Sequence, residues 1–286
     1  MKTLRMFGMA LVAIIMGVSL SSCSKDENPD GDNQSKEKKL TKMVAVIEGG
    51  VEVGYIFTYD NNGKLNEAQY KDCYWSYTNG VPTGVTPTIY TCQYAWSGDI
   101  INATHGNGKS VFNQETGLIE SVKITTPYST KNYTYTYSSD RIAKIEEDNG
   151  NLTEVTWNGD KLMKNSKLIY DGTLTEDDTY TITSYTGTCK KGYCPLIPEM
   201  IESAGSTCLL YMAHPELIGS QTTQLPTSRT HYYPHYFNGE PEHYTMTTDI
   251  TYEFAEDGYI SKINIANHYS DGNFEDDSLT YILTWE

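Results

Sequence analysis

Three histidines with the same parity offer the first candidate for chemistry. His231, His235 and His243 would share one face of an extended strand, because side chains alternate between the two faces. Imidazole nitrogens bind zinc and copper, so the spacing is compatible with a metal centre. Neighbouring tyrosines make a mixed tyrosine and histidine surface at least as good an interpretation, and such a surface could stack against sugar rings. We predict no metal site here.

Five of the six cysteines lie far from the N-terminus, and they could form disulfides or supply a nucleophile. Secretion would permit disulfides, but an odd number cannot all pair. Cys73 and Cys92 could face each other on neighbouring strands, and one pair in the later group could fix its segment. The spacing of the later group matches no zinc motif. His214 is near this group only in sequence, which is weak support for a catalytic pair. The five are Cys73, Cys92, Cys189, Cys194 and Cys208.

Three acidic runs, at 146–148, 176–178 and 275–277, could supply paired carboxylates for glycoside hydrolysis or oxygen ligands for calcium. Each lies beside glycine or asparagine in a predicted turn, where charge normally keeps a protein in solution and discourages pairing of sheet edges. The sequence contains no calcium loop of the EF-hand type, nucleophile elbow, P-loop or dinucleotide motif. It therefore predicts no catalytic residues, no enzymatic activity and no cofactor.

Composition narrows the class of protein further. The chain of 286 residues has 37 acidic and 21 basic residues, a formal net charge of −16. This balance argues against a nucleic-acid partner, because binding to phosphates depends on lysine and arginine. Tyrosine appears 24 times and phenylalanine 6 times. Tyrosine suits half-exposed faces of sheets, where the ring packs and the hydroxyl stays in water, so the composition favours an all-β protein.

Residues 1–22 have the organisation of a lipoprotein signal peptide. Two basic residues precede an apolar run over 7–18 that is too short to span a membrane. The following residues 20–23 (LSSC) resemble a bacterial lipobox. The resemblance implies cleavage before Cys23, lipidation of its thiol, and attachment to a membrane through acyl chains.

Residues 23–39 are predicted to be an acidic, polar tether that leads to a single domain over 40–286. Proline and glycine disfavour a helix there, and the charged residues cannot be buried. Residues 24–27 (SKDE) resemble the acidic export tag of Bacteroidota surface lipoproteins. That resemblance implies a position on the outer leaflet of the outer membrane, facing the medium. An ordinary solvated tether is a similarly good interpretation of these residues, and it leaves a periplasm-facing protein as the alternative.

From residue 40 onward the sequence repeats one pattern, an alternating aromatic or β-branched strand followed by a Gly, Asn or Asp turn. One example runs from Tyr55 through residues 60–63 (DNNG) to Leu65. Its second half looks like the Tyr-Asp repeat of Rhs-type shells, which we interpret as shared hairpin geometry. Strand faces of tyrosine and threonine are unlike the lipid-facing surface of a porin. The pattern predicts an all-β fold, a strongly curved antiparallel meander that forms a partial or closed barrel-like sheet.

The segment 187–241 interrupts this pattern and contains six of the ten prolines. Residues 198–204 could form two helical turns, with proline in the first position. An apolar segment that cannot join a sheet must be buried against one, so we predict an irregular, partly helical lid. Such a lid commonly closes the face or end of a sheet, and it could line a pocket at the same time. The residues that would line this pocket are Leu196, Met200, Ile201, Leu209, Leu210, Met212, Leu217 and Ile218.

Several of these features together resemble a Bacteroidota lipoprotein family of unknown function that has a porin-like fold. They are the lipobox, the acidic tether, the tyrosine-rich hairpins, the stretch from 215–219 to 225–226, and the closing stretch 252–263. The resemblance covers most of the chain from residue 40. It implies a strongly curved antiparallel sheet or partial barrel, supplies no catalytic residues, and carries a suggestion of lipid binding.

These observations lead to a lipid-anchored envelope protein without enzymatic activity, whose expected role is to bind a lipid or another small apolar ligand. Its expected partners are the membrane, through Cys23, and that ligand; no nucleic acid is expected. One alternative is a surface adhesin that binds glycans or proteins, and another is a structural envelope protein without a ligand. The exposed aromatic residues of an adhesin would include Trp75, Tyr77, Tyr232, Tyr233 and Tyr236.

Overall fold

A computed structural model describes most of the predicted domain. The predicted leader, the predicted lipidation site Cys23 and all but the last two residues of the predicted tether lie outside the described part of the chain. No helix among the described residues is long and apolar enough to cross a membrane. The described residues are 38–47, 50–78, 81–170, 174–192, 194, 196–201, 205–219, 223–237, 240–270 and 276–286, with the backbone alone described at 75–78, 81–83, 174–177, 199, 233–237 and 240–243.

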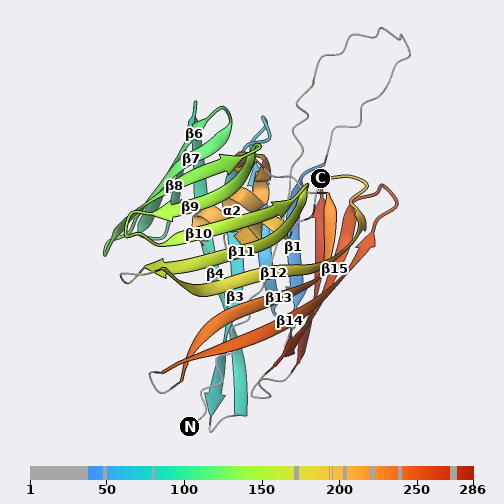
Figure 1. Ribbon diagram of the computed structural model, residues 1–286. Coiled ribbons are helices and arrows are strands. Elements are labelled where there is room, and N and C mark those ends of the chain that lie inside the picture. Colours follow the sequence, from blue (N-terminus) through green and yellow to red (C-terminus); the bar gives the residue numbers. More distant parts are fainter. Residues whose placement is uncertain are drawn as a thin grey trace, which may run out of the picture.

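Sixteen antiparallel strands form a closed barrel in which strands that follow one another in the sequence are paired (Figure 1). Closure comes from β1 and β16, where Met43 pairs with Leu283 and Val44 with Ile282. This confirms the predicted all-β antiparallel meander and shows that the sheet closes. The strands are β1 (Leu40–Val46), β2 (Glu52–Tyr59), β3 (Leu65–Thr78), β4 (Val81–Ser97), β5 (Ile100–His105), β6 (Gly108–Glu115), β7 (Leu118–Thr125), β8 (Thr130–Ser138), β9 (Arg141–Glu147), β10 (Leu152–Asn158), β11 (Lys161–Tyr170), β12 (Leu174–Thr188), β13 (Gln224–Phe237), β14 (Glu240–Phe254), β15 (Ile260–Tyr269) and β16 (Asp277–Trp285).

The barrel has two ends that we distinguish by their connections. The terminal end holds Lys38, Glu286 and the turns after even-numbered strands. The far end holds the turns after odd-numbered strands, such as 106–107. Lys39 and Glu286 exchange two backbone hydrogen bonds of 2.6 and 2.8 Å, which continue the β1–β16 pairing at the terminal end. The chain therefore reaches and leaves the barrel at the same end.

Apolar side chains face the inside of the barrel. On β16, Tyr281 and Leu283 are buried, whereas Thr280 and Thr284 on the opposite face are exposed. Strand β5 shows the same alternation of buried and exposed residues. Membrane-spanning barrels carry an apolar band on their outer face. These strands have the opposite arrangement, with the hydrophobic core enclosed by the sheet.

A repeated aromatic contact organises the terminal end. In seven hairpins of the described part, an aromatic side chain donates a hydrogen bond from its hydroxyl or indole N–H. The aromatic residue lies near the end of the even-numbered strand. The acceptor is a backbone carbonyl near the start of the preceding strand, so each bond closes one hairpin. The donor–acceptor pairs are Tyr59–Leu40, Trp96–Leu65, Tyr137–Ile119, Trp157–Ile142, Tyr185–Leu162, Tyr252–Pro226 and Trp285–Ile260.

Basic side chains complete this contact in four hairpins. In each, the lysine or arginine directly before the acceptor residue lies over the aromatic ring, a favourable cation–π arrangement. Each packing unit therefore joins a basic and an aliphatic residue at the start of one strand to an aromatic residue near the end of the next. The turn between Tyr59 and Lys64 accordingly separates the aromatic residue of one unit from the basic residue of the following unit. The pairs are Lys39–Tyr59 at 4.6 Å, Lys64–Trp96 at 5.0 Å, Arg141–Trp157 at 5.6 Å and Lys161–Tyr185 at 5.3 Å from the ring centroid.

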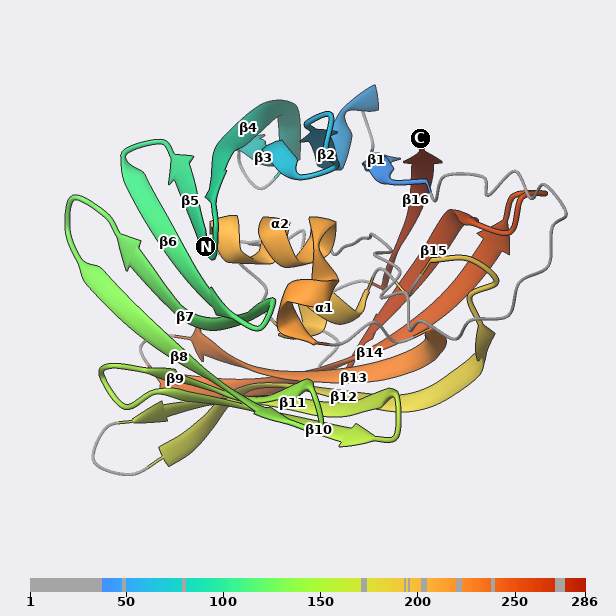
Figure 2. The same cartoon turned by 90° about the horizontal axis from the view of Figure 1, so that it is seen from above.

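The segment between β12 and β13 lies inside the barrel, as Figure 2 shows. This helical segment contains α1 (Ile197–Ile201), α2 (Gly205–Ala213) and the 3-10 helix η2 (Pro215–Ile218). The side chains of α2 from Ser206 to Ala213 are all buried, as expected for a helix that is enclosed on every side. The predicted partly helical lid is confirmed between β12 and β13. It is shorter than the predicted segment 187–241, because residues from Gln224 onward pair in the sheet as β13 and the start of β14.

Two residues fix the helical segment to the wall. The Nε2 atom of His214 accepts a hydrogen bond of 3.1 Å from the backbone N–H of Leu65, and its Nδ1–H donates to the Glu216 carboxylate at 2.6 Å. Gly219 follows η2 with a φ of 72°. A Cβ atom at this position would overlap the carbonyl oxygen of Asp140, so the close approach of η2 to the wall requires glycine.

Candidate functional site

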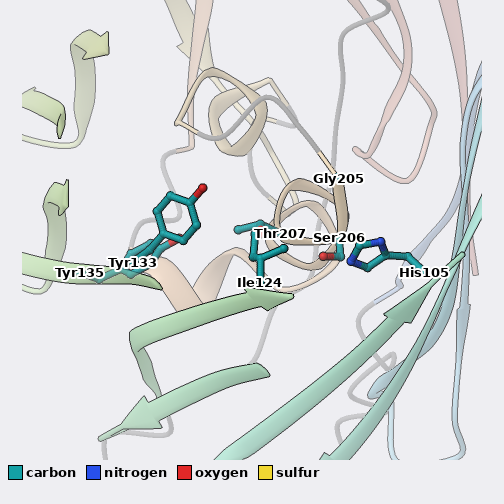
Figure 3. A pocket seen from close by; sticks show the side chains of 7 residues that line it. All are labelled: His105, Ile124, Tyr133, Tyr135, Gly205, Ser206 and Thr207. Atoms are coloured by element: carbon teal, nitrogen blue, oxygen red, sulfur yellow. The ribbon is translucent and has the colours of Figure 1, made fainter. Parts of the chain in front are cut away.

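A cavity of about 200 Å³ lies between the first turn of α2 and the inner wall of the barrel (Figure 3). Its wall residues come from the far-end halves of β5 and β7 and from the middle of β8. The cavity therefore lies on the far-end side of the helical segment, where the helices do not fill the space completely. Its lining residues are His105, Ile124, Tyr133, Tyr135, Gly205, Ser206 and Thr207.

One side of the cavity is polar. The Nε2 atom of His105 lies 3.3 Å from the Ser110 hydroxyl, which lies 2.8 Å from the Ser206 hydroxyl. Burial lowers the pKa of His105, so the imidazole is neutral at pH 7 and can both donate and accept a hydrogen bond. Gly108 makes room for this ring, because a Cβ atom there would lie 2.6 Å from the His105 Cε1 atom. The polar side can thus exchange hydrogen bonds with a bound molecule.

The histidine and serine contact does not form a nucleophilic site. Nucleophilic catalysis needs a serine whose oxygen can reach the substrate as well as a neighbouring base. Ser110 is completely buried between the wall and α2, and Ser206 is 3% exposed. Their hydroxyls bond to each other, and this contact fixes α2 to β6. The arrangement favours binding over hydrolysis.

Aromatic and aliphatic side chains form the other side of the cavity. Tyr133 and Tyr135 both face inward from β8, and Ile124 faces inward from β7 (Figure 3). The Tyr135 ring meets the ring of Tyr211 on α2 edge-on, at 6.1 Å between centroids. This contact fixes the ring from behind. The cavity therefore joins a rigid aromatic wall to a small set of polar groups, which is the usual chemistry of a small-molecule site.

The eight residues predicted to line a pocket are brought together in the core between the helical segment and the wall. Each of them is at most 4% exposed, and none lines the cavity beside α2. A ligand that touched them would have to separate packed side chains. Their role as ligand contacts stays a prediction.

The residues that do line the cavity were not predicted from the sequence. His105 is a single histidine next to a hairpin turn, and Ser206 and Thr207 are ordinary residues near a helix start. Their proximity depends on strands and a helix about a hundred residues apart in the chain. The alternation of Tyr133 and Tyr135 indicated a shared face, but it did not indicate what this face meets.

The predicted histidine and tyrosine surface is only partly described. His231 faces the inside of the barrel and is 1% exposed; it stacks on Tyr180 at 4.0 Å, and its Nε2 atom lies 2.6 Å from the Asp178 carboxylate. Burial lowers the pKa of His231. Tyr232 is half-buried. The side chains of the other predicted surface residues, His235, His243, Trp75, Tyr77, Tyr233 and Tyr236, lie outside the described part. Within that part, no three metal-ligating side chains come together.

The cysteines correct one expectation. Cys73 pairs in register with Pro87 and Cys92 with Ala68, so the two cysteines do not face each other across β3 and β4. Cys92 faces inward with its partner Ala68. Cys73 is an odd number of positions from Ala68 on β3, so it lies on the opposite face. All five described cysteines are free thiols. Burial raises the pKa of Cys194 to about 12 and that of Cys92 to about 11, which keeps both protonated at neutral pH.

Several carboxylates of the acidic runs form ion pairs or hydrogen bonds with nearby side chains at the far end. The Glu147 carboxylate lies 2.6 Å from the Lys131 ammonium. Asp276 lies 2.8 Å from the His268 ring, and Asp277 accepts a hydrogen bond of 2.7 Å from Asn267. These contacts fix strand ends in the far-end turns.

Comparison with known proteins relates the chain by fold alone. No protein-family model and no curated protein matches it. The crystal structure of a porin-like protein from Bacteroides uniformis ATCC 8492 has a TM-score of 0.60 and 16% sequence identity, over 85% of this chain and 96% of that one. A porin-like protein from Bacteroides vulgatus ATCC 8482 has a TM-score of 0.45 and 13% identity, over 86% and 98%. The porin-like fold expected from the resemblance is thus confirmed, whereas membership of a lipoprotein family stays a prediction.

Proposed function

We propose that the chain is a non-enzymatic binding protein of the cell envelope. In this proposal a lipid on Cys23 holds it to the outer membrane at the cell surface, and it takes a small amphipathic ligand into the far end of its barrel. The observation that carries the proposal is the cavity beside α2, with its aromatic wall and its few convergent polar groups. The ligand class includes the small apolar molecules and lipids expected from the sequence, provided that one end of the ligand is polar.

The position of the chain ends supports this orientation. The chain reaches the barrel at Lys38 and Lys39, beside Glu286, at the terminal end. A lipid on Cys23 would therefore hold the terminal end toward the membrane. The helical segment enters the barrel at this same end, between β12 and β13. The cavity lies on the other side of the segment, toward the far end and the surrounding medium.

The size and lining of the cavity limit its ligand. A volume of about 200 Å³ is below the roughly 300–1,000 Å³ of sites for drug-sized molecules, so the cavity fits a small molecule or the end of a longer one. The polar end of the ligand would bond to the His105 imidazole on the polar side of the cavity. Its apolar part would lie against Ile124 and the tyrosine rings of β8.

Native mass spectrometry tests this function directly. The full-length chain with Cys23→Ala, purified from its own host's envelope, should carry a stoichiometric adduct that leaves on denaturation. Fragmentation of the adduct would identify its chemical class, and a lipid or amphipathic mass would support the proposal. The substitution prevents covalent lipidation, so any lipid mass must come from a bound molecule.

Two substitutions on β7 separate the cavity from the rest of the protein. Ile124→Trp should fill the cavity and remove at least about nine-tenths of the adduct, because the indole would occupy the space of the ligand. Lys123→Trp places the same side chain on the outer face, one residue away, and should leave the adduct unchanged. An adduct that survives Ile124→Trp in a folded barrel, or a Cys23→Ala chain without any adduct, would overturn the proposal.

A further inference from the structure

A row of tyrosine rings extends along the inner face of β3 and β4 toward the far end. In the register of these strands, Tyr70 lies opposite Tyr90, and Asp72 and Tyr74 follow Tyr70 on the same face of β3. This is the inner face, because it continues from the buried pair Ala68 and Cys92. The two strands are among the longest in the barrel, and Figure 1 shows their hairpin reaching beyond the neighbouring strands.

The position of Tyr90 places this row at the mouth of the barrel. Cys92 pairs with His105, the last residue of β5. Tyr90 lies two residues before Cys92 on β4, which places it nearer the far end and beyond the turn that joins β5 to β6. It has no partner on β5. The rings in the row therefore pass from the core into the open space at the far end.

The rings pack in sequence and become progressively exposed. The Tyr55 and Tyr70 rings stack at 5.1 Å, and those of Tyr70 and Tyr90 stack at 6.0 Å. The hydroxyls of Tyr74 and Tyr90 lie 3.1 Å apart. Tyr55 is 6% exposed, whereas Tyr90 is 48% and Tyr74 is 58% exposed. The outer residues are thus about half exposed to solvent, while the inner rings pack against them.

One carboxylate lies among these rings. Asp72 stands between Tyr70 and Tyr74 on β3, and its Oδ1 atom accepts a hydrogen bond of 2.8 Å from the backbone N–H of Cys73. Burial, and then the charge of Asp72 and its hydrogen bond, raise the pKa of Tyr70. Within the described part of the chain, Asp72 forms no ion pair with a lysine, arginine or histidine. Among the described side chains, the cluster therefore carries a carboxylate that no cation pairs with.

The terminal end of the same barrel shows what this cluster lacks. There, lysine and arginine side chains lie over the rings of Tyr59, Trp96, Trp157 and Tyr185. Among the described residues, no such cation lies over Tyr70, Tyr74 or Tyr90. The far-end rings have a carboxylate beside them instead. A cationic ligand could therefore take the position that a lysine or arginine side chain occupies at the terminal end.

We propose that Asp72, Tyr74 and Tyr90, with Tyr70 packed behind Tyr90, form a binding site for a small organic ammonium ion in solution. Ring faces attract weakly hydrated cations, and tyrosine cages recognise quaternary ammonium groups in this way. The carboxylate supplies the opposite charge. The net charge of −16 raises the local concentration of cations around the protein. A bare metal ion fits less well, because one carboxylate cannot replace its hydration shell. The site is independent of the cavity beside α2.

Titration calorimetry with choline and its uncharged isostere 3,3-dimethyl-1-butanol tests this site in the full-length chain. Choline should bind saturably, and the isostere at least about tenfold more weakly, because it has the same shape without the charge. Asp72→Asn should weaken choline binding by about tenfold or more. Tyr90→Leu should abolish it, whereas Tyr90→Phe, which keeps the ring, should stay within about threefold of wild type.

Matched controls separate the site from general charge and from the proposed function. Asp148→Asn removes another acid at the far end, and Tyr128→Leu removes a tyrosine that is 96% exposed in the β7–β8 turn. Both should leave the affinity for choline unchanged, and so should Ile124→Trp. Equal binding of choline and the isostere, wild-type affinity in a folded Asp72→Asn variant, or no saturable binding would each overturn the assignment. Binding to phosphatidylcholine vesicles without binding of free choline would also overturn it.

Discussion

The Nε2 atom of His214 lies 3.1 Å from the backbone nitrogen of Leu65, although the two residues are 149 positions apart in the chain. The same imidazole packs edge-on against Trp96 at 5.0 Å and against Tyr59 at 6.1 Å. Both rings belong to the repeated aromatic contact that closes the hairpins at the terminal end. One histidine therefore connects the helical segment to the side chains that organise the barrel wall.

Replacement of His214 by alanine should destabilise the fold by about 2–4 kcal/mol. The change leaves the buried N–H of Leu65 without an acceptor and opens a space between two aromatic rings. Urea unfolding followed by circular dichroism measures the loss. His268→Ala is the control, because His268 is about half exposed on the outside of the barrel, and it should cost less than about 0.5 kcal/mol. Similar losses in both variants would contradict this role of His214.

Removal of a single hydroxyl from the repeated contact should have a smaller effect. The Tyr137 hydroxyl donates to the Ile119 carbonyl at 2.7 Å, so Tyr137→Phe should cost about 1 kcal/mol while the ring stays packed. Thermal and urea unfolding of Tyr137→Phe and Tyr128→Phe form the matched comparison. Tyr128 is 96% exposed, and its hydroxyl should contribute nothing measurable. If both variants match wild type, the hydrogen bond has no net stabilising role.

Two glycines with positive φ should differ sharply in their tolerance of alanine. Gly219 has a φ of 72° and faces the carbonyl oxygen of Asp140, whereas Gly117 has a φ of 86° and open space around it. Gly117→Ala should cost about 1 kcal/mol, from the backbone conformation alone. Gly219→Ala adds the overlap and should cost about 3 kcal/mol or more. Denaturant midpoints would measure both, and equal costs would mean that η2 can move away from the wall.

Acid should weaken the contact between β1, β2 and β3. Hydrogen bonds from Lys42 and Lys71 lower the pKa of Glu52 to about 2. Because the pKa in the folded state is below that in the unfolded chain, the contribution of Glu52 is present above about pH 4.5 and is lost as the pH falls toward 2. Glu52 is 37% exposed, so the effect at neutral pH should be below about 1 kcal/mol.

Glu52→Gln should therefore lower the melting temperature at pH 7 and have little effect at pH 2. Thermal unfolding at the two pH values measures this difference. Glu154→Gln, an exposed position on β10, is the control and should show no such dependence. A Glu52→Gln variant whose loss is the same at both pH values would contradict the ion-pair explanation.

The barrel was predictable from the sequence because its determinants are local. Each packing unit lies within one hairpin, and the turn between Tyr59 and Leu65 supplies the aromatic residue of one unit and the basic and aliphatic residues of the next. No single hairpin could predict that the barrel closes, because closure depends on the register of β1 with β16 across the whole domain. The helical segment was recognised by its prolines and its apolar content, which also predicted that it would be buried.

The candidate sites were not predictable in the same way. The eight apolar residues of the helical segment were selected as ligand contacts because they are apolar, and the same property places them in the core. The cavity arises where β5, β7, β8 and α2 meet, which no local pattern records. Asp72 lies between tyrosines on one face of its strand. Its proposed role as a ligand contact depends on the register of β3 and β4, which places Tyr90 opposite Tyr70.

Pairing of β1 with β16 also dictates when folding can finish. Leu40 and Trp285 are partners at the seam, so the circle of hydrogen bonds stays incomplete until the final strand of the barrel is free to pair. Until then β1 and β15 are unprotected edges that could join strands of other molecules. An emerging chain therefore keeps two exposed edges until its final strand pairs, and any truncation that removes β16 would make this vulnerability permanent.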